Sequence, residues 1–336
     1  MPPAEKHILE IDSAELAFGE RRILSGVYLL VETGGVTAVL GRNGCGKSCL
    51  MKILSGSLKA GFCSMRIDGK WHRRFTEKEI RYLPQHPFIP GWLRLERALG
   101  DFGLQREDLE RWFPEFISLR GTRIGELSGG EQRILECFII LRSPARFILL
   151  DEPFSALDSY LKWNLEIELA DLLATFNGPI LWVSHDRDEC YRNCRSVCVM
   201  EDGRTGEVTP MDEMIRHPGS VSAARLAGCK NFFAAEARDG KVYLPEWNVA
   251  LPLAGMENTF TTIGIPDNAV TMSENGAMSC TVCRVILGVE ENILLLRPEG
   301  SAEGAPMLRI TVGHESDLQA GAAVRIALDY SKLLLL

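Results

Sequence analysis

The feature that most constrains the fold of this chain is one glycine-rich octapeptide, Gly41-Arg42-Asn43-Gly44-Cys45-Gly46-Lys47-Ser48. It matches the pattern G-x-x-x-x-G-K-[ST] and lies between an apolar run at 36–40 and a helical-looking stretch at 49–54. Glycines allow the backbone to wrap around a phosphate, so that successive N–H groups and the helix N-terminus face the anion. The order of strand, loop and helix predicts a P-loop in an α/β domain, with Lys47 at the β- and γ-phosphates and Ser48 on Mg²⁺.

Two more apolar runs, at 147–150 and 180–183, lack alternation and are also followed by reactive residues. Such runs are typical of parallel strands buried on both faces, and chemistry in these sheets lies beyond the carboxyl ends of the strands. Asp151 follows the first of them, where it can hold Mg²⁺ through water, and Glu152 is placed to polarise an attacking water as a general base. The region between the first two strands, about 77–123, has mixed helical character with several prolines, and we expect an inserted helical subdomain there.

Length and charge limit the remaining choices. A chain of 336 residues suggests about two domains, and a net charge of −8 disfavours a nucleic-acid partner. After residue 220 the pattern changes to short apolar runs separated by turn residues, which predicts a small all-β domain. We place the boundary near residue 230, and the second part, 231–336, holds seven basic and thirteen acidic residues.

No membrane-spanning or secretory segment is expected. The longest apolar runs fall far short of the roughly 18 residues that a spanning helix needs, and the first residues lack the basic and apolar regions of a signal peptide. The ten cysteines are therefore expected to be free thiols in a reducing compartment. Cys280 and Cys283 form a lone CxxC, which is too little to indicate a zinc or redox site.

A family resemblance follows from a third segment, Leu127-Ser128-Gly129-Gly130-Glu131, which resembles the signature sequence of ATP-binding cassette (ABC) ATPases. Further segments occur in the order that this family shows. They are Phe18, similar to the A-loop aromatic residue; Gln85 after 81–84, similar to the Q-loop; Ser155-Ala156-Leu157-Asp158, similar to the D-loop; and Ser184-His185-Asp186, similar to the switch histidine.

The resemblance implies a P-loop NTPase fold of the ABC ATPase type over 1–230, with a helical subdomain at about 85–135, ATP and Mg²⁺ as cofactors, and ATP hydrolysis as the activity. It makes Glu152, His185 and Gln85 the catalytic residues, and Ser48, Gln85 and Asp151 the metal-binding residues. The cofactor-binding residues it implies are Phe18, Gly41, Arg42, Asn43, Gly44, Cys45, Gly46, Lys47, Ser48, Cys49, Ser128, Gly129, Gly130 and Asp158.

The resemblance also implies partners. Ser128, Gly129 and Gly130 would face the γ-phosphate of an ATP bound by a second subunit, so the expected unit is a head-to-tail homodimer, with Asp158 communicating across it. Transmembrane permease subunits and a periplasmic or lipid-anchored substrate-binding protein are expected in the same system. The chain would then be peripheral, on the cytoplasmic face of the cell membrane.

Three departures from the family pattern concern the site. Glu131 stands where many members have Gln, Cys49 stands where Thr is common, and Cys45 lies inside the loop. Because the loop binds phosphate through backbone N–H groups, the two cysteines do not remove its function. The span from Gln85 to Ser128 is shorter than in most importer ATPases, which affects the docking surface for the membrane partner.

The β-rich tail bears on the substrate. It resembles the OB-like (TOBE) regulatory domain of importer ATPases, and about 147–265 resembles molybdate-importer ATPases, whereas the first 145 residues are more similar to stand-alone cassettes. The expectation is therefore an importer subunit for molybdate or a similar oxyanion. Since the tail is acidic, an oxyanion would need N–H and hydroxyl donors, for which Ser, Thr and Gly at 261–281 are candidates. The alternatives are an ABC ATPase of a lipid or other exporter, and a soluble ABC protein without a transport role.

Overall fold

The structure, a computed structural model, describes residues 6–155, 159–252, 260–314 and 318–336. The chain divides into two compact units, Met1–Asp212 and Glu213–Leu336. The boundary expected near residue 230 falls inside the second unit, because the helix α8 (Val221–Leu226) packs on a strand of that unit, β15 (Thr262–Ile265).

The first unit is built on a six-stranded sheet with the order β10-β9-β3-β8-β7-β6. Its inner strands run parallel, and β10 is antiparallel to β9. The three apolar runs predicted as buried strands are strands, and every residue of β7 and β8 is buried. The bounds are β3 (Val36–Leu40), β6 (Ile80–Leu83), β7 (Phe147–Asp151), β8 (Ile180–Ser184), β9 (Ser196–Glu201) and β10 (Arg204–Pro210).

A second sheet of the first unit, with the order β2-β1-β4-β5, was not predicted from the sequence. All of its pairs are antiparallel, and its inward residues, such as Leu9, Ile11 and Leu24, share a core with Met51 and Leu54 of the helix that follows the glycine-rich loop. The sheet therefore packs against the helix that follows the loop. Its strands are β1 (Ile8–Phe18), β2 (Arg21–Glu32), β4 (Phe62–Ile67) and β5 (Lys70–His72).

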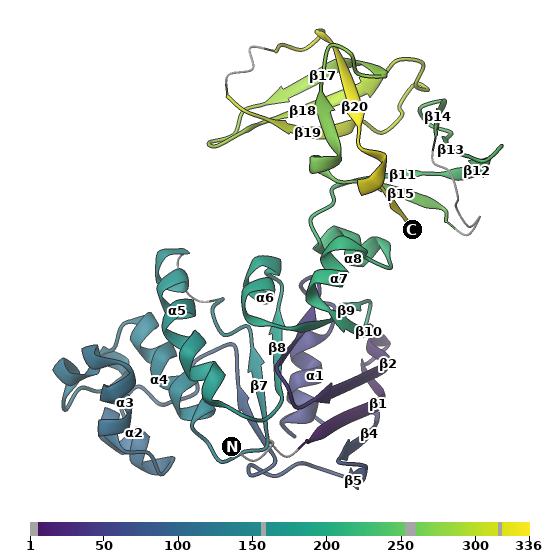
Figure 1. The fold of residues 1–336 in the computed structure, drawn as a ribbon. Coiled ribbons are helices and arrows are strands. Elements are labelled where there is room, and N and C mark those ends of the chain that lie inside the picture. The colour runs from purple at the N-terminus through teal and green to yellow at the C-terminus, as the bar shows by residue number, and fades with distance from the viewer. Residues whose placement is uncertain (1–5, 156–158, 253–259, 315–317) are drawn as a thin grey trace. The chain divides into compact units, whose positions relative to one another are not determined.

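Helices complete the first unit, and Figure 1 shows α2 and α3 at the end of this unit away from β1 and β4. The helical segments between β6 and β7 reach Leu141, the end of α4. The helices are α1 (Lys47–Leu54), α2 (Leu95–Asp101), α3 (Arg106–Trp112), α4 (Gly129–Leu141), α5 (Ser159–Thr175), α6 (Arg187–Asn193) and α7 (Met211–Arg216), the last of which contains the unit boundary; the 3-10 helices are η1 (Pro114–Leu119) and η2 (Ile124–Glu126).

The second unit is rich in antiparallel strands around one core, in which the rings of Phe233 and Trp247 lie 4.1 Å apart between centroids. Its sheets have the orders β11-β15-β21, β12-β13-β14 and β16-β20-β17-β18-β19. The description of this unit as OB-like (TOBE) stays a prediction. The other bounds are β11 (Asn231–Ala234), β12 (Glu236–Arg238), β13 (Lys241–Leu244), β14 (Val249–Leu251), β16 (Val270–Met272), β17 (Met278–Ile286), β18 (Asn292–Pro298), β19 (Leu308–Val312), β20 (Ala323–Leu328), β21 (Leu334–Leu335), η3 (Asp267–Ala269) and η4 (Tyr330–Lys332).

Candidate nucleotide-binding and hydrolysis site

The glycine-rich loop connects the carboxyl end of β3 to the N-terminus of α1, as the sequence predicts. At two of its glycines a side chain would collide with neighbouring atoms. A Cβ on Gly41 would lie 2.3 Å from the carbonyl oxygen of Met200, and one on Gly46, whose φ is +111°, would lie 2.7 Å from Leu24 Cδ2. The Lys47 ammonium donates to the carbonyl oxygens of Gly41 at 2.6 Å and Arg42 at 3.1 Å. The loop therefore wraps around the Lys47 ammonium and leads into the N-terminus of α1, where the first backbone N–H groups of the helix favour an anion.

Asp151 lies at the end of β7, buried beside the first turn of α1. Its Oδ1 accepts a hydrogen bond from Ser48 Oγ at 3.1 Å, and its Oδ2 accepts one from the Tyr82 hydroxyl at 2.9 Å. Burial raises the pKa of the Asp151 carboxyl, and the two hydroxyl donors oppose that shift. Burial, followed by the charge of Asp151, raises the pKa of Tyr82, so this hydroxyl remains a donor.

Glu152 occupies a left-handed backbone conformation with φ +45°, which is uncommon for a residue other than glycine. Its N–H donates to the carbonyl oxygen of Val183 at 2.9 Å, which ties the turn to β8. The carboxylate accepts a hydrogen bond from Gln85 Nε2 at 3.0 Å, and its other oxygen lies 3.1 Å from His185 Nδ1. The three residues expected to be catalytic therefore meet at one point, from the ends of three neighbouring parallel strands.

The signature residues lie at the N-terminus of α4. Ser128 caps this helix, since its Oγ accepts from the Glu131 N–H at 3.3 Å while the Glu131 carboxylate accepts from the Ser128 N–H at 2.7 Å. Ser128 and Gly129 are exposed, and Gly130 is buried. The departure at Glu131 preserves this reciprocal capping box, which a Gln at the same position would also close.

Two expected site residues stay predictions. Phe18 lies at the end of β1 with 54% of its surface exposed, so its ring is open to solvent rather than part of the core. Asp158 lies outside the described residues, as do Ala156 and Leu157. Arg42, Asn43 and Gly44 are exposed in the loop, whereas Cys45 and Cys49 are half-buried free thiols.

Three side chains at the site were not predicted: Tyr82, Arg133 and Glu136. Tyr82 lies on β6 and reaches Asp151 across the β6–β7 pair. Arg133 and Glu136 are buried within α4 and bind backbone groups of the loops that carry Gln85 and Glu152. The available signal was the pair of charges at i and i+3, because Arg133 directly precedes the otherwise apolar stretch 134–141 and Glu136 interrupts it.

The oxygen atoms of Ser48, Asp151 and Gln85 suit Mg²⁺, which prefers hard oxygen ligands and retains water. Ser48 and Asp151 are already in hydrogen-bond contact, so the chain brings a hydroxyl and a carboxylate together beside the loop. This small donor set fits an ion that takes its other ligands from water and phosphate oxygens. Over the described residues no group of three or more His, Cys, Asp or Glu side chains is placed to hold a metal.

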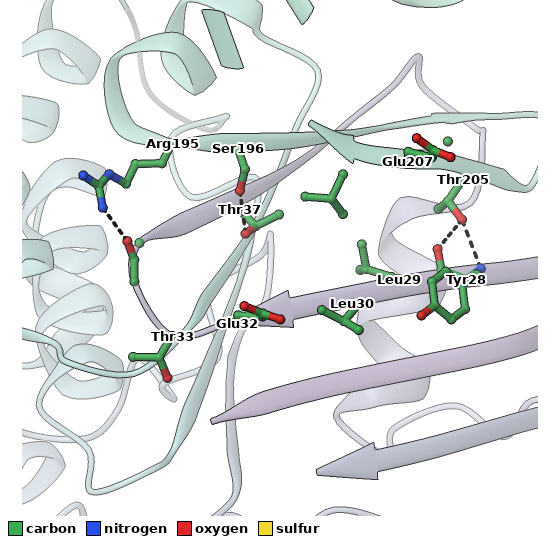
Figure 2. Close-up of a pocket in the computed structure, with 14 residues that line it drawn as sticks. Tyr28, Leu29, Leu30, Glu32, Thr33, Thr37, Arg195, Ser196, Thr205 and Glu207 are labelled. Atoms are coloured by element: carbon green, nitrogen blue, oxygen red, sulfur yellow. Dashed lines mark hydrogen bonds between the residues drawn. The ribbon is translucent and has the colours of Figure 1, made fainter. Parts of the chain in front are cut away.

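A cavity of about 630 Å³ lies at the opposite end of β3 from the glycine-rich loop, between β2 and β10 (Figure 2). Thr205 closes one side of it, since its hydroxyl accepts from the Tyr28 N–H at 3.1 Å and donates to the Tyr28 carbonyl oxygen at 2.6 Å. At the other side Arg195 Nη1 donates to the carbonyl oxygen of Gly34 at 2.8 Å. The cavity is at the amino ends of the parallel strands, away from the edge where chemistry occurs in such sheets.

Two of the candidate anion donors of the tail are used within the fold. The N–H groups of Thr261 and Thr262 both donate to the carbonyl oxygen of Leu336, and residues 278–286 form β17. Cys280 and Cys283 are free thiols on this strand.

Comparisons with known proteins identify relatives of this chain. Residues 24–155 match the family described as ABC transporter. Among curated relatives, the Fe(3+) ions import ATP-binding protein FbpC 3 of Rhodococcus jostii is 28% identical over 91% of this chain and 92% of its own length. The FbpC protein of Streptomyces coelicolor is 26% identical over 100% of this chain and 98% of its own length, and that of Escherichia coli K12 is 25% identical over 82% of both.

Solved structures show the same fold. An ATP-binding subunit of an ABC transporter aligns with a TM-score of 0.52 and 23% identity, over 65% of this chain and 97% of that one. A bacterial Atm1-family ABC exporter with ATP bound aligns with a TM-score of 0.58 and 19% identity, over 67% of this chain and 43% of that one. In the described residues no helix is long and apolar enough to cross a membrane.

Proposed function

We propose that this chain, which carries an ABC transporter ATP-binding domain and hydrolyses ATP, is the energy-supplying subunit of an importer for ferric ions. The observation that carries the proposal is the extent of the relatives' match. A nucleotide-binding domain alone is shared by importers, exporters and soluble proteins, but these relatives also align with the second unit. The lipid-exporter and soluble alternatives do not explain that tail.

In the proposed reaction Glu152 is the general base that takes a proton from the attacking water. Gln85 and His185 hold its carboxylate from two sides, and the strained turn at Glu152 fixes where that carboxylate points. The N–H groups of the glycine-rich loop and the ammonium of Lys47 stabilise the charge that develops on the phosphate oxygens. Mg²⁺ on Ser48, Asp151 and Gln85 would neutralise phosphate charge when bound.

The proposed assembly is a homodimer of this chain. Ser128 and Gly129 are exposed at the N-terminus of a thirteen-residue helix, which is a geometry that favours an anion brought by another molecule. The same proposal places a permease against the chain, a substrate-binding protein on the far side of the membrane, and the chain itself at the cytoplasmic face. The importers named among the relatives support these partners.

The substrate in this proposal replaces the sequence-based expectation of molybdate. The molybdate expectation rested on the likeness of 147–265 to molybdate-importer ATPases, whereas the relatives from Rhodococcus, Streptomyces and Escherichia are named for Fe(3+). The acidic second unit is also a poor attractor for an oxyanion. In this proposal the ferric ion is the cargo of the permease, and the chain supplies the energy for its transport.

ATP hydrolysis by the purified chain tests the catalytic roles. Lys47→Ala and Glu152→Gln are each expected to lower kcat at least about a hundredfold, because one removes a phosphate contact and the other the base. Lys52→Ala, an exposed lysine on the same helix as Lys47, is the matched control and should keep the wild-type rate. Wild-type turnover in Glu152→Gln would contradict the base assignment.

Uptake measurements test the substrate separately. In a strain that lacks the gene, wild-type chain should restore uptake of radioactive ferric ion, and Glu152→Gln should not. Restoration of molybdate uptake with no change in iron uptake would show that the substrate proposal is wrong. That result would leave the ATPase assignment intact.

A further inference from the structure

A buried ion pair lies within α4, one to two turns from the capped N-terminus that carries the signature residues. Arg133 is 5% exposed and Glu136 is 0% exposed, and their side chains are 3.3 Å apart. A charge at such a position is costly to bury unless all of its hydrogen-bonding groups are satisfied. The hydrogen-bond partners of this pair therefore show which parts of the fold the two side chains hold in place.

Arg133 binds two loops at once. Its Nε donates to the carbonyl oxygen of Pro153 at 2.5 Å, and its Nη1 donates to that of Pro84 at 2.9 Å. Pro84 immediately precedes Gln85, and Pro153 immediately follows Glu152. The planar guanidinium fork therefore sets the spacing between the loops that carry two residues of the hydrolysis site.

Glu136 binds the far end of the first loop. Its Oε1 accepts hydrogen bonds from the N–H groups of Phe88 at 2.9 Å and Ile89 at 3.3 Å. The loop at 84–89 is thus held at both ends by the two members of one pair, with Gln85 between the attachment points. Any shift of α4 along its axis would move both attachments and the turn at Glu152.

Stability alone does not account for a pair at this position. A buried ion pair is often no more stabilising than apolar residues of similar volume, because the cost of desolvation offsets the attraction. The directional contacts to two separate loops are what apolar side chains would lack. A difference in catalysis, rather than in folding, is therefore the property to examine.

We propose that Arg133 and Glu136 are positioning residues for ATP hydrolysis, which hold the Gln85 and Glu152 loops in register with the signature helix. They act through the backbone of Pro84, Phe88 and Pro153, to which their side chains are hydrogen-bonded. The inference rests on the catalytic roles proposed for Gln85 and Glu152, and not on which substrate is transported.

The test uses two changes in the purified full chain. Arg133→Lys keeps the positive charge but loses the fork, so that only one of the two loop carbonyls can be reached. The double change Arg133→Met with Glu136→Leu keeps the volume and removes all directional contacts. Each is expected to lower kcat about tenfold to a hundredfold, the range for a misplacement of about 1 Å, while KM for ATP stays within about threefold.

A second Arg–Glu pair, in which Arg192 is 40% exposed and only Glu166 is buried, provides the control. Arg192 donates to both carboxylate oxygens of Glu166, at 2.6 and 3.0 Å, and Glu166 is 5% exposed. Arg192→Lys and the double change Arg192→Met with Glu166→Leu should leave kcat within about twofold, since this pair joins α5 to α6 and binds neither loop. Thermal unfolding checks that all four variants are folded.

Two results would overturn the inference. One is a folded Arg133→Lys variant with the wild-type kcat. The other is a loss of kcat that comes with an equal loss of nucleotide affinity, or that the control variants show to the same extent. If Glu152→Gln itself retained full activity, the proposed catalytic role would fail instead. The two failures are therefore distinguishable in the same assay.

Discussion

Tyr82→Phe removes one hydroxyl from the site and leaves the ring in place. In the wild type this hydroxyl donates to Asp151 Oδ2 at 2.9 Å, while Ser48 Oγ donates to Oδ1. Asp151 is 1% exposed, so solvent has little access to replace the lost donor. The variant therefore keeps a buried carboxylate with one fewer hydrogen bond.

The expected magnitude follows from that contact. A hydrogen bond to a charged buried group contributes about 1.5 to 3 kcal/mol to the free energy of unfolding. For a unit the size of Met1–Asp212, each kcal/mol shifts Tm by about 2 to 4 °C, so Tm should fall by about 3 to 12 °C near neutral pH. Tyr191→Phe is the control, because Tyr191 is 54% exposed, and its Tm should stay within about 2 °C.

The pH dependence has a definite sign. Burial already raises the pKa of Asp151 in the folded wild type, and loss of the Tyr82 donor raises it further, whereas the pKa in the unfolded chain is unchanged. A higher folded pKa means that the folded variant binds more protons at intermediate pH. Its stability deficit is therefore full above the folded pKa of the variant and shrinks as the pH falls through the folded pKa values toward the ordinary value.

Thermal unfolding without nucleotide, followed by circular dichroism at pH 7.5 and at pH 5, measures both quantities. An unchanged Tm of Tyr82→Phe at pH 7.5 would refute the assigned contact. A deficit that grows as the pH is lowered would refute the electrostatic reasoning while leaving the contact possible through packing alone.

Three further outcomes are expected. Ser128→Ala should lower the free energy of unfolding by about 1 kcal/mol through loss of the helix cap, whereas Glu131→Gln should change it by less than about 0.5 kcal/mol because Gln also closes the capping box. Urea titration measures both free energies, and equal losses in the two variants would contradict the assignment of Ser128 as the cap. Asn231→Ala should lower the free energy of unfolding of the second unit by about 2 to 4 kcal/mol in the same titration, because the buried side-chain amide is hydrogen-bonded to backbone groups of two other segments. A loss below about 1 kcal/mol would be inconsistent with those hydrogen bonds. Burial raises the pKa of Cys137 and of Cys280 to about 12, so an alkylating reagent at pH 8 should leave both unmodified until the chain is unfolded, as read by mass spectrometry; labelling of either thiol in the folded chain would count against this.

Prediction from the sequence was most successful where the structure is a local property of the backbone. The loop at 41–48 needs glycine where a Cβ would collide, and it must join a buried strand to a helix. Both requirements produce a recognisable sequence pattern within about a dozen residues. The strands that precede Asp151 and His185 were recognisable for the same reason, since burial on both faces demands an unbroken apolar run.

The antiparallel sheet of β1, β2, β4 and β5 was missed because its evidence is spread over distant segments. β1 pairs with β2 and also with β4, which begins at Phe62, and several register shifts interrupt the alternation. The nearly full length of the match to curated relatives is likewise a property of the whole chain. No single segment of the tail determines the substrate, which stays a proposal. The molybdate expectation rested on the resemblance of one stretch, 147–265.

The sequence by itself determined that a glycine-rich loop, an Asp-Glu pair and a histidine follow buried apolar strands, and the family resemblance added the glutamine. Only the tertiary structure decided that Glu152 is held between Gln85 and His185, that Tyr82 supports Asp151, and that Arg133 joins the loops around them. The physical reason is the range of the interactions. Loop and strand identity depend on neighbours along the chain, whereas the partners of a buried charge are set by which segments the fold packs against it.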